Sequence, residues 1–393
     1  MKESIKVLDP CKCTGCGSCF HSCPTQSISM VENSEGFLYP LVDERCISCG
    51  ICIKHCPILT PIQKTNNDKE IYGLILKNDD ILFKSSSGGV FPVIAEYVIN
   101  NKGYVFGCAL NNDLEPEHIA INNINELYKL QGSKYVESNL GDCFPKIRNY
   151  LSNGCLVLFT GTPCQAAGLI SFLGKPYNNL ITIDLVCHGV PSRKLFSSYI
   201  TWLSKKNNDK IIQYNFRDKK NGWGLKGSSF TKNKNIKVNP DSDPYYFSFL
   251  RGETYRESCY KCSYASMNRV GDFTIGDFWG VDKFFPLINT KKGVSVCILN
   301  TEKACALFTS IKSNFIAFPC TEDQIIKYNH NLNSPTNRPL IREEIYNNLN
   351  TLEPNLFSKS IKTMPLYMRF LKNIYRLLFP ISVRKKIRRI IKT

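Results

Sequence analysis

Two short runs of cysteine carry the most specific chemistry in this sequence. CTGCGSCFHSCP begins at Cys13, and CISCGICIKHCP begins at Cys46 with the same spacing. In C-x2-C-x2-C-x3-C-P, three thiolates wrap one cubane iron–sulfur cluster, while the fourth lies too far along the turn and ligates the other cluster. The spacing therefore predicts two [4Fe-4S] clusters. Their ligands are Cys13, Cys16, Cys19 and Cys56 for one cluster, and Cys46, Cys49, Cys52 and Cys23 for the other.

A pair of zinc sites built from C-x2-C knuckles is the alternative. It leaves half of the eight cysteines without a role and does not explain the duplicated x3-C-P, so we favour the clusters. Gly15, Gly17 and Gly50 let the backbone pass close to inorganic sulfide and direct N–H groups towards it. Cys11 stands outside the spacing and is predicted to be a spare thiol.

Composition sets the class of protein. The chain has 393 residues, 43% of them hydrophobic and 21% charged, which fits a soluble globular protein of two or three domains. Nineteen cysteines without a signal peptide at residues 1–12 indicate metal binding rather than disulfides. No apolar stretch reaches the roughly 18 residues of a spanning helix, so we expect a cytoplasmic protein.

The net charge of +17 comes largely from the end of the chain. Residues 359–393 carry eleven Lys and Arg and no acidic residue, whereas residues 1–62 are about neutral. This distribution gives no support for nucleic-acid binding. The tail LYMRFLKNIYRLLFPISVRKKIRRIIKT interleaves apolar and basic residues, as helices do that lie on anionic membranes. Peripheral contact with the inner membrane surface is one interpretation, a helix packed on its own domain is the other, and Pro380 would kink or break either.

The middle of the chain alternates between strand and helix patterns. A polar linker, QKTNNDKE, follows the cysteine runs, and three strand–helix–strand units come after it. We therefore predict an α/β (α+β) fold with partly parallel strands, in which a small bacterial-type ferredoxin domain is fused to a larger α/β domain. The predicted strands are 71–76, 104–110, 155–160, 180–187 and 294–300, and the predicted helices are 90–101, 163–174 and the segment from 301.

Two loops lie where ligands collect, beyond the carboxyl ends of strands. Residues 85–89, SSSGG, offer hydroxyls and bare N–H groups that suit phosphate, although such residues also cap helices that bind nothing. In GTPCQ, Thr162 and Gln165 form a capping-box pattern, which places Cys164 in the first helical turn, where the helix dipole favours the thiolate.

A third set of thiols follows from this position. Cys187 ends the next predicted strand, and Cys259 and Cys262 form a further C-x2-C with no partner knuckle nearby in sequence. Together with Cys164 they supply four ligands for a third cluster. The alternatives are that Cys164 and Cys187 are small core residues, or that the four thiols bind zinc. The remaining cysteines, 108, 143, 155, 297, 305 and 320, are predicted to be structural.

One motif matches a dinucleotide-binding pattern only formally. GWGLKG, residues 222–227, matches G-x-G-x-x-G but follows the polar FRDKKN, and the residues after it are not helical. A dinucleotide loop needs a strand before it and a helix after it, so we reject this interpretation.

Taken together, the motifs resemble the beta-subunit family of coenzyme F420 hydrogenases and dehydrogenases, in its form with an N-terminal double-cluster ferredoxin domain. Relatives in this family include a reductase of 7-hydroxymethyl chlorophyll. The resembling segments are SSSGGV (85–90), GSKYVES (132–138), LFTGTPCQAAGL (158–169), DLVCHGVPS (184–192), FRDKKNGWG (216–224) and SCYKCSYASMNRVGDFTIGDFWG (258–280).

The resemblance implies a non-covalent FAD and a core [4Fe-4S] cluster bound by Cys164, Cys187, Cys259 and Cys262. It implies flavin contacts from Ser87, Gly88, Gly89, Ser133, Lys134 and Tyr135. Lys134 would place positive charge near the flavin and stabilise its reduced anion. His188 is a candidate proton donor or a structural histidine, and Asp272 and Asp277 are candidate active-site groups or loop-shaping carboxylates.

The implied organisation is a ferredoxin domain at 1–62, an FAD and [4Fe-4S] catalytic domain at 70–340, and a basic, partly amphipathic tail at 341–393. Our first functional hypothesis is an oxidoreductase that exchanges electrons with a redox protein such as ferredoxin and hydride with a small molecule, F420-like or other. The second is an electron-transfer subunit of a larger complex with no substrate of its own. A redox sensor without turnover is the third, and it predicts clusters without flavin.

Overall fold

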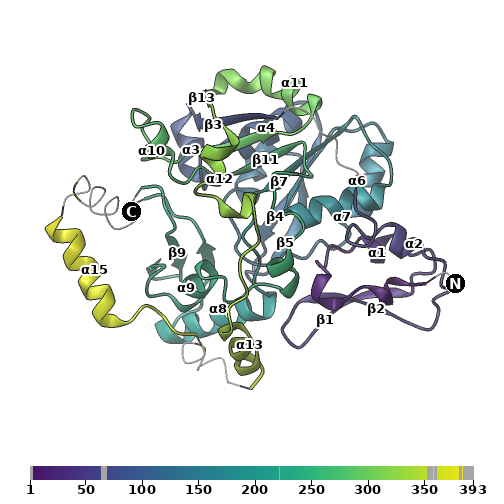
Figure 1. Cartoon of the computed structure of the whole chain (residues 1–393), viewed down its shortest axis with the longest axis horizontal. Coiled ribbons are helices and arrows are strands. Elements are labelled where there is room, and N and C mark those ends of the chain that lie inside the picture. The colour runs from purple at the N-terminus through teal and green to yellow at the C-terminus, as the bar shows by residue number, and fades with distance from the viewer. Residues whose placement is uncertain are drawn as a thin grey trace.

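The computed structural model describes residues 3–62, 69–220, 222–351, 357, 361–379 and 383. Most of the predicted linker, residues 63–68, and the predicted break at Pro380 lie outside these residues. Within the described part, an eight-stranded mixed sheet forms the centre of the molecule (Figure 1). A three-stranded sheet lies beside it, and a two-stranded sheet belongs to the N-terminal unit.

The large sheet confirms the predicted α/β class. Its four inner strands run parallel, and those on either side pair antiparallel. In sheet order the strands are β13 (Phe315–Pro319), β3 (Glu70–Leu76), β12 (Ser295–Leu299), β11 (Phe273–Asp277), β7 (Leu180–Leu185), β6 (Val157–Gly161), β4 (Tyr104–Leu110) and β5 (Pro116–Ile121).

Helices cover both faces of this sheet, as the alternation of side chains along β6 demonstrates. Leu158 packs in one apolar core with α4 (Val90–Asn100) and α11 (Glu302–Ile311). Its neighbour Phe159 packs in a second core with α6 (Cys143–Ser152) and α7 (Pro163–Leu173). Successive strand residues point to opposite faces, so the two helix pairs lie on opposite sides of the sheet. Shorter helices are α3 (Asp79–Lys84), α5 (Leu127–Leu130), α10 (Val281–Phe284) and α12 (Glu322–Ile326).

An aromatic-rich subdomain surrounds the small antiparallel sheet. The strands are β8 (Gln213–Asn215), β9 (Gly227–Phe230) and β10 (Asn235–Val238), and the helices are α8 (Arg193–Asn207) and α9 (Pro244–Leu250). Tyr199 of α8 stacks on Tyr245 of α9 with 5.0 Å between ring centroids. Strand β9 begins at Gly227, the last residue of the GWGLKG motif, so the residues after this motif are not helical, as the sequence predicted.

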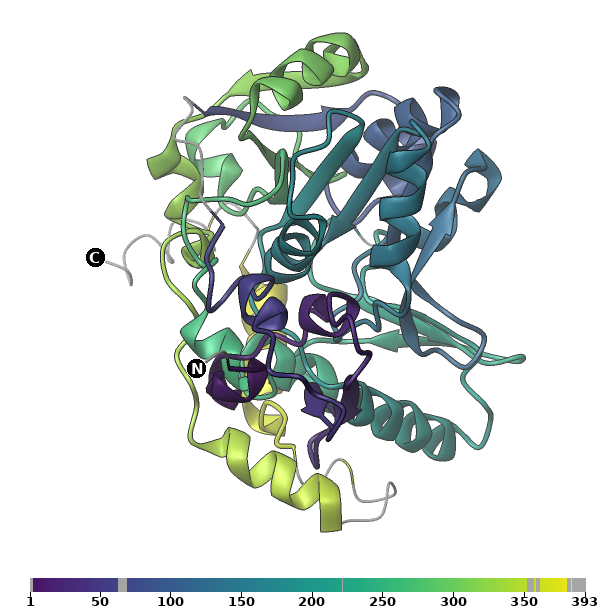
Figure 2. The ribbon, with the colours of Figure 1, turned by 90° about the vertical axis from the view of Figure 1, so that its right-hand side faces the viewer.

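The N-terminal unit is a duplicated structure of the kind that the two cysteine runs predict. Each run leads into a one-turn helix, α1 (Ser18–His21) or α2 (Ile51–Lys54), and the hairpin of β1 (Ile28–Glu32) and β2 (Leu38–Val42) lies between the runs. Gly17 and Gly50 precede these helices with φ of 73° and 77°, a left-handed conformation that only glycine adopts readily. Both views place this unit against the body of the molecule (Figure 1, Figure 2).

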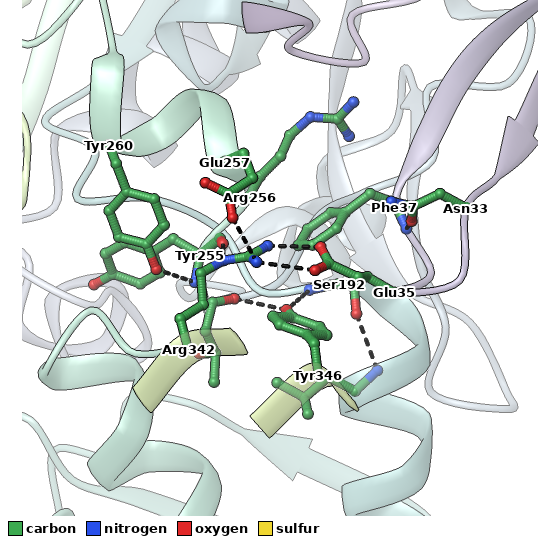
Figure 3. Close-up of polar contacts among 12 residues, drawn as sticks. Asn33, Glu35, Phe37, Ser192, Tyr255, Arg256, Glu257, Tyr260, Arg342 and Tyr346 are labelled. Atoms are coloured by element: carbon green, nitrogen blue, oxygen red, sulfur yellow. Dashed lines mark hydrogen bonds and ion pairs between the residues drawn. The ribbon is translucent and has the colours of Figure 1, made fainter. Parts of the chain in front are cut away.

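A buried arginine from the C-terminal part of the chain joins three segments (Figure 3). Arg342, in α13 (Ile341–Thr351), donates to both carboxylate oxygens of Glu35 at 2.9 and 2.6 Å and pairs with Glu257 at 2.7 Å. The next turn brings Tyr346, whose hydroxyl donates to the Thr254 carbonyl oxygen at 2.8 Å. Because Arg342 and Tyr346 are buried, this helix belongs to the folded body. This corrects the prediction that the tail begins at residue 341.

The last described helix is α15 (Leu366–Leu378), which lies at the edge of the molecule, on the opposite side from the N-terminal unit (Figure 1). Among the described residues, no helix combines the length and the apolar character that crossing a bilayer requires.

Candidate functional site

A cavity of about 450 Å³ lies at the carboxyl ends of β6, β7 and β11, where the sequence placed ligand-binding loops. Its volume falls within the range of roughly 300–1,000 Å³ that small-molecule sites occupy. Most of the predicted cofactor and catalytic residues line it: Ser87, Gly89, Ser133, Lys134, Tyr135, His188 and Asp277. Cys187 lines it too, which brings the predicted core thiols next to the predicted cofactor site.

The serine–glycine loop forms one wall of this cavity, but its glycines are needed for packing as well. The N–H of Gly88 donates to Ser295 Oγ at 2.8 Å, and a Cβ at Gly88 would lie 2.0 Å from the Leu74 carbonyl oxygen. Gly88 therefore lies against the sheet instead of lining the cavity. Gly89, with φ of 84°, begins α4, so the amino end of an 11-residue helix opens on the cavity.

The GSKY segment faces this loop. Ser133 donates to Ser86 Oγ through its N–H at 2.8 Å and its hydroxyl at 3.0 Å. Lys134 Nζ donates to the carbonyl oxygens of Lys129 and Gln131, at 3.0 and 2.9 Å. Burial lowers the pKa of Lys134 to about 8. An ammonium group solvated by two carbonyl oxygens at a cavity wall favours an anionic ligand group.

An arginine that the sequence reading missed joins the two loops. Arg217 donates to the Ser86 carbonyl oxygen at 3.1 Å and to the Tyr135 hydroxyl at 2.9 Å, and pairs with Asp277 at 2.6 Å. Trp223 Nε1 also donates to Asp277, at 2.9 Å, and Trp223 stacks on Trp279. The FRDKKNGWG segment, which carries part of the family resemblance, thus positions the cavity wall.

The three predicted catalytic residues separate into two groups. His188 and Asp277 line the cavity, and burial lowers the pKa of His188. Asp272 instead precedes β11, at the end of the strand opposite to Asp277. Its carboxylate accepts hydrogen bonds from the hydroxyls of Thr182 and Thr301, both at 2.9 Å. Asp272 is therefore a structural residue of the sheet, and we correct its assignment as a catalytic candidate.

The four predicted core thiols influence one another electrostatically. Burial raises the pKa of Cys187 to about 12, and the neighbouring Cys164 and Cys262 thiols raise it further. Burial also raises the pKa of Cys259, and the neighbouring Cys187 and Cys164 thiols raise it further. Each of the four thiols therefore lies near enough to others of the set for their charges to interact.

Hydrogen bonds in the neighbouring segments position these cysteines. Gln165 Oε1 accepts from the Thr162 N–H at 3.0 Å, the predicted capping interaction, which starts α7 just before Cys164. Asp184, at the end of β7, accepts from Arg269 at 2.8 Å, which draws the chain after Cys262 towards Cys187. Burial raises the pKa of Cys164 to about 11, so desolvation outweighs the helix dipole that the sequence reading emphasised.

The first predicted ferredoxin set also converges. Cys13, Cys16, Cys19 and Cys56 line one small, mainly apolar cavity in the N-terminal unit. Burial raises the pKa of Cys16 to about 12, and Cys13, Cys56 and Cys164 raise it further. A Cβ at Gly168 in α7 would lie 2.7 Å from Cys16 Cβ and 3.0 Å from its Sγ. Only a glycine in the helix that carries Cys164 allows the N-terminal unit to approach this closely.

Arg256, three residues before Cys259, links the N-terminal unit to the large domain. Its side chain donates to the carbonyl oxygens of Cys13 and Leu38 at 2.7 and 2.8 Å and pairs with Glu137 at 2.8 Å. Both charged side chains are buried. Neither Arg256 nor Gly168 belongs to a ligand pattern, so no sequence signal identified them.

Comparisons with known proteins bear on this arrangement. Residues 12–58, which span both cysteine runs, match the 4Fe-4S dicluster domain. Residues 155–321 match the C-terminal region of the beta subunit of coenzyme F420 hydrogenase/dehydrogenase. Over these residues the chain is similar to that family. The match includes all four predicted core thiols and the Arg217 segment, and it confirms the resemblance inferred from the sequence.

The family is one of oxidoreductase subunits, and the dicluster domain makes this chain an iron–sulfur protein. A solved structure, the F420-reducing [NiFe] hydrogenase complex from Methanosarcina barkeri in xenon-derivatised form, contains a chain with 14% sequence identity. The alignment covers 72% of this chain and 95% of that one, with a TM-score of 0.47. No curated protein sequence matches this chain.

His118 is a further residue of the cavity wall that the sequence reading missed. Its Nε2 lies 3.1 Å from the Thr160 carbonyl oxygen, which can only accept, so this nitrogen carries the proton. Nδ1 then accepts from the Ser138 hydroxyl at 2.9 Å. Burial lowers the pKa of His118 to about 4, which leaves it neutral beside Lys134 at physiological pH.

Proposed function

We propose that this chain is a flavin-dependent iron–sulfur oxidoreductase in which electrons enter through the dicluster domain and reach FAD in the 450 Å³ cavity. FAD, when bound, exchanges electrons singly with clusters and in pairs, as hydride, with a small molecule. The observation that carries this proposal is the packing of Cys16 against Gly168 in α7, the helix that also carries Cys164, whose thiol interacts electrostatically with Cys187 at the cavity wall.

Four cysteines of the large domain are the proposed ligands of a cluster along this route. Cys164, Cys187, Cys259 and Cys262 would hold a third [4Fe-4S] cluster between the dicluster domain and the cavity. Desolvation of Cys164, Cys187 and Cys259 favours their protonated form in the absence of metal, and iron would replace those protons.

The residues of the cavity fit a flavin nucleotide. The amino end of α4 at Gly89 and the ammonium group of Lys134 supply positive potential for phosphates or for a reduced, anionic ring. Arg217 fixes the Ser86 loop and Tyr135, so both walls keep their spacing. His188 and Asp277 line the remaining space and are the candidate proton-handling groups for the bound small molecule, F420-like or other.

Anaerobic purification with iron, sulfide and flavin quantitation tests this proposal. We expect about twelve irons per chain, three cubanes of four, and one FAD. In Cys262→Ser, iron should fall to about eight while the dicluster domain is retained. The matched control is Cys320→Ser, a cysteine outside all predicted sets, which should keep twelve. About eight irons and no flavin in the wild-type protein would contradict the proposal.

A second function, an electron-transfer subunit without its own substrate, is favoured by one surface feature. Ile47, between Cys46 and Cys49, is 66% exposed, so an apolar side chain of the second cysteine run is available for contact with a protein partner. The matched family is one of beta subunits, which work within larger complexes. Recovery of a stoichiometric catalytic partner, with no reduction of small-molecule acceptors by the isolated chain, would support this function.

A further inference from the structure

Helix α15 has its apolar side turned outwards. Leu366, Phe370 and Leu377 repeat at spacings of four and seven, so they follow one face, and they are 75%, 65% and 85% exposed. Tyr367, Leu371 and Leu378 repeat one position later and are exposed as well. Two adjoining apolar rows therefore face solvent along the whole helix.

The opposite side of α15 is basic and faces the body of the protein. Lys372 Nζ lies 2.6 Å from both carboxylate oxygens of Asp241, and the Met364 N–H donates to the Asp241 carbonyl oxygen at 3.2 Å. Arg369, one turn before Lys372, is half-buried. A surface helix of a globular protein buries its apolar side and exposes its charges, and α15 has the reverse orientation.

We propose that α15 seats the protein on an anionic membrane surface, with its two apolar rows entering the lipid interface. The Asp241 contact then fixes the body of the protein on the cytosolic side of the helix. The helix has a strongly apolar face, a basic face and no acidic residue, which are the properties of interfacial helices.

Charge favours anionic lipid over other occupants. Residues 359–393 carry eleven Lys and Arg and no acid, and six of these cations follow residue 380 in the sequence. Each such cation near an anionic leaflet adds attraction that salt screens. A second copy of this chain would fit poorly, because a symmetric pairing of two α15 helices would bring two basic segments together.

The location of α15 agrees with this role. The helix and the N-terminal unit lie on opposite sides of the molecule (Figure 1). Lipid contact through α15 therefore leaves the two cysteine runs accessible to a soluble electron donor or acceptor. This inference stands apart from the proposed electron route, since neither Asp241 nor α15 contributes to the cavity wall.

Co-sedimentation of the full-length, cluster-loaded protein with lipid vesicles tests the proposal. We expect binding to vesicles of phosphatidylcholine and phosphatidylglycerol, and binding weaker by roughly tenfold or more to phosphatidylcholine alone or at high salt. Phe370→Glu/Leu377→Glu should reduce binding to the anionic vesicles by at least the same factor, because both charges would enter the lipid interface.

The matched control is Leu287→Glu/Leu340→Glu, which changes two leucines that are 98% and 92% exposed outside α15. It should bind like the wild type, and the iron content of both variants should be unchanged. Equal binding by the α15 variant and the control would overturn the proposal. So would absence of vesicle binding together with a dimer, detected by sedimentation velocity, that the α15 variant abolishes, since α15 would then pair with a second copy.

Discussion

The two cysteine runs share one spacing but lie in different surroundings. Cys13, Cys16, Cys19 and Cys56 are all buried, whereas Cys23, Cys46 and Cys49 are partly exposed and only Cys52 of the second set is buried. The first set abuts α7, and the second set abuts a surface where Ile47 is exposed. Because solvent exposure and hydrogen bonds to sulfur tune cluster potentials, identical motifs here predict clusters with different roles.

We call the first set the inner set and the second the outer set. Ligand spacing identifies the cofactor, while the surroundings of each set determine which partner its cluster could exchange electrons with. Under the proposed function, a cluster held by the inner set would pass electrons towards a cluster held by the core thiols, and a cluster held by the outer set would exchange them with another protein.

The largest expected effect comes from removing one ligand of each set. Cys16→Ser should abolish reduction of the cavity flavin by a protein donor, because it breaks the route at the α7 contact. Cys49→Ser should slow the same reaction but leave reduction by a small chemical reductant intact. Stopped-flow absorbance of flavin reduction measures both. Equal effects of the two variants with both reductants would remove the distinction between inner and outer sets.

A smaller effect should follow from the arginine beside each set. Arg256→Met leaves Glu137 buried without its partner, and breaking such a pair costs about 3–5 kcal/mol in the free energy of unfolding. Arg45, beside the outer set, pairs with Asp43 on the surface, so Arg45→Met should leave stability unchanged. Chemical denaturation under anaerobic conditions measures both. A large loss in Arg45→Met, or none in Arg256→Met, would contradict the difference in burial.

Larger side chains at position 168 should progressively weaken the packing of α7 against Cys16 of the inner set. Overpacking costs about 1–3 kcal/mol, and here the cost falls on the contact between α7 and Cys16. We expect Gly168→Ala to slow flavin reduction by a protein donor modestly and Gly168→Val to slow it more, at constant iron content. Loss of iron in step with the rate would mean that the residue supports cluster assembly instead of the approach of the two units.

The smallest effect concerns the cavity end of the route. Lysine is cationic below its pKa, and burial lowers the pKa of Lys134 to about 8. FAD affinity should therefore fall as pH rises through about 8, with His118 already neutral over this range. Lys134→Met should weaken FAD binding at pH 7 by roughly tenfold, the value of one charge-assisted hydrogen bond, and remove the slope. Fluorescence titration of the apoprotein with FAD at several pH values measures this. A slope that persists in Lys134→Met would assign it to another group.

The sequence predicted local features well. The duplicated spacing, the strand–helix alternation and the start of α7 at Pro163 all depend on residues close together in the chain. Such patterns follow from the chemistry of the cluster and from the periods of helix and strand.

Features that depend on distant contacts were not predictable. Gly168 is an ordinary small residue within a helix until Cys16, some 150 residues away, packs on it. Arginine residues usually lie on protein surfaces, yet the side chains of Arg217 and Arg342 each form buried ion pairs. Asp272 and Asp277 share one motif, and only the direction of β11 separates the structural carboxylate from the one at the cavity.

Arg256 has a consequence for how this molecule operates. Its guanidinium group holds the Cys13 and Leu38 carbonyl oxygens while neutralising Glu137 in the interior. Release of the N-terminal unit would break both of these hydrogen bonds and leave part of a buried guanidinium group without acceptors. Some redox proteins carry electrons on a mobile arm that visits donor and acceptor in turn. In this chain the Arg256 hydrogen bonds attach the N-terminal unit to the body, so under the proposed function donor and acceptor proteins would bind the N-terminal unit at this attached position.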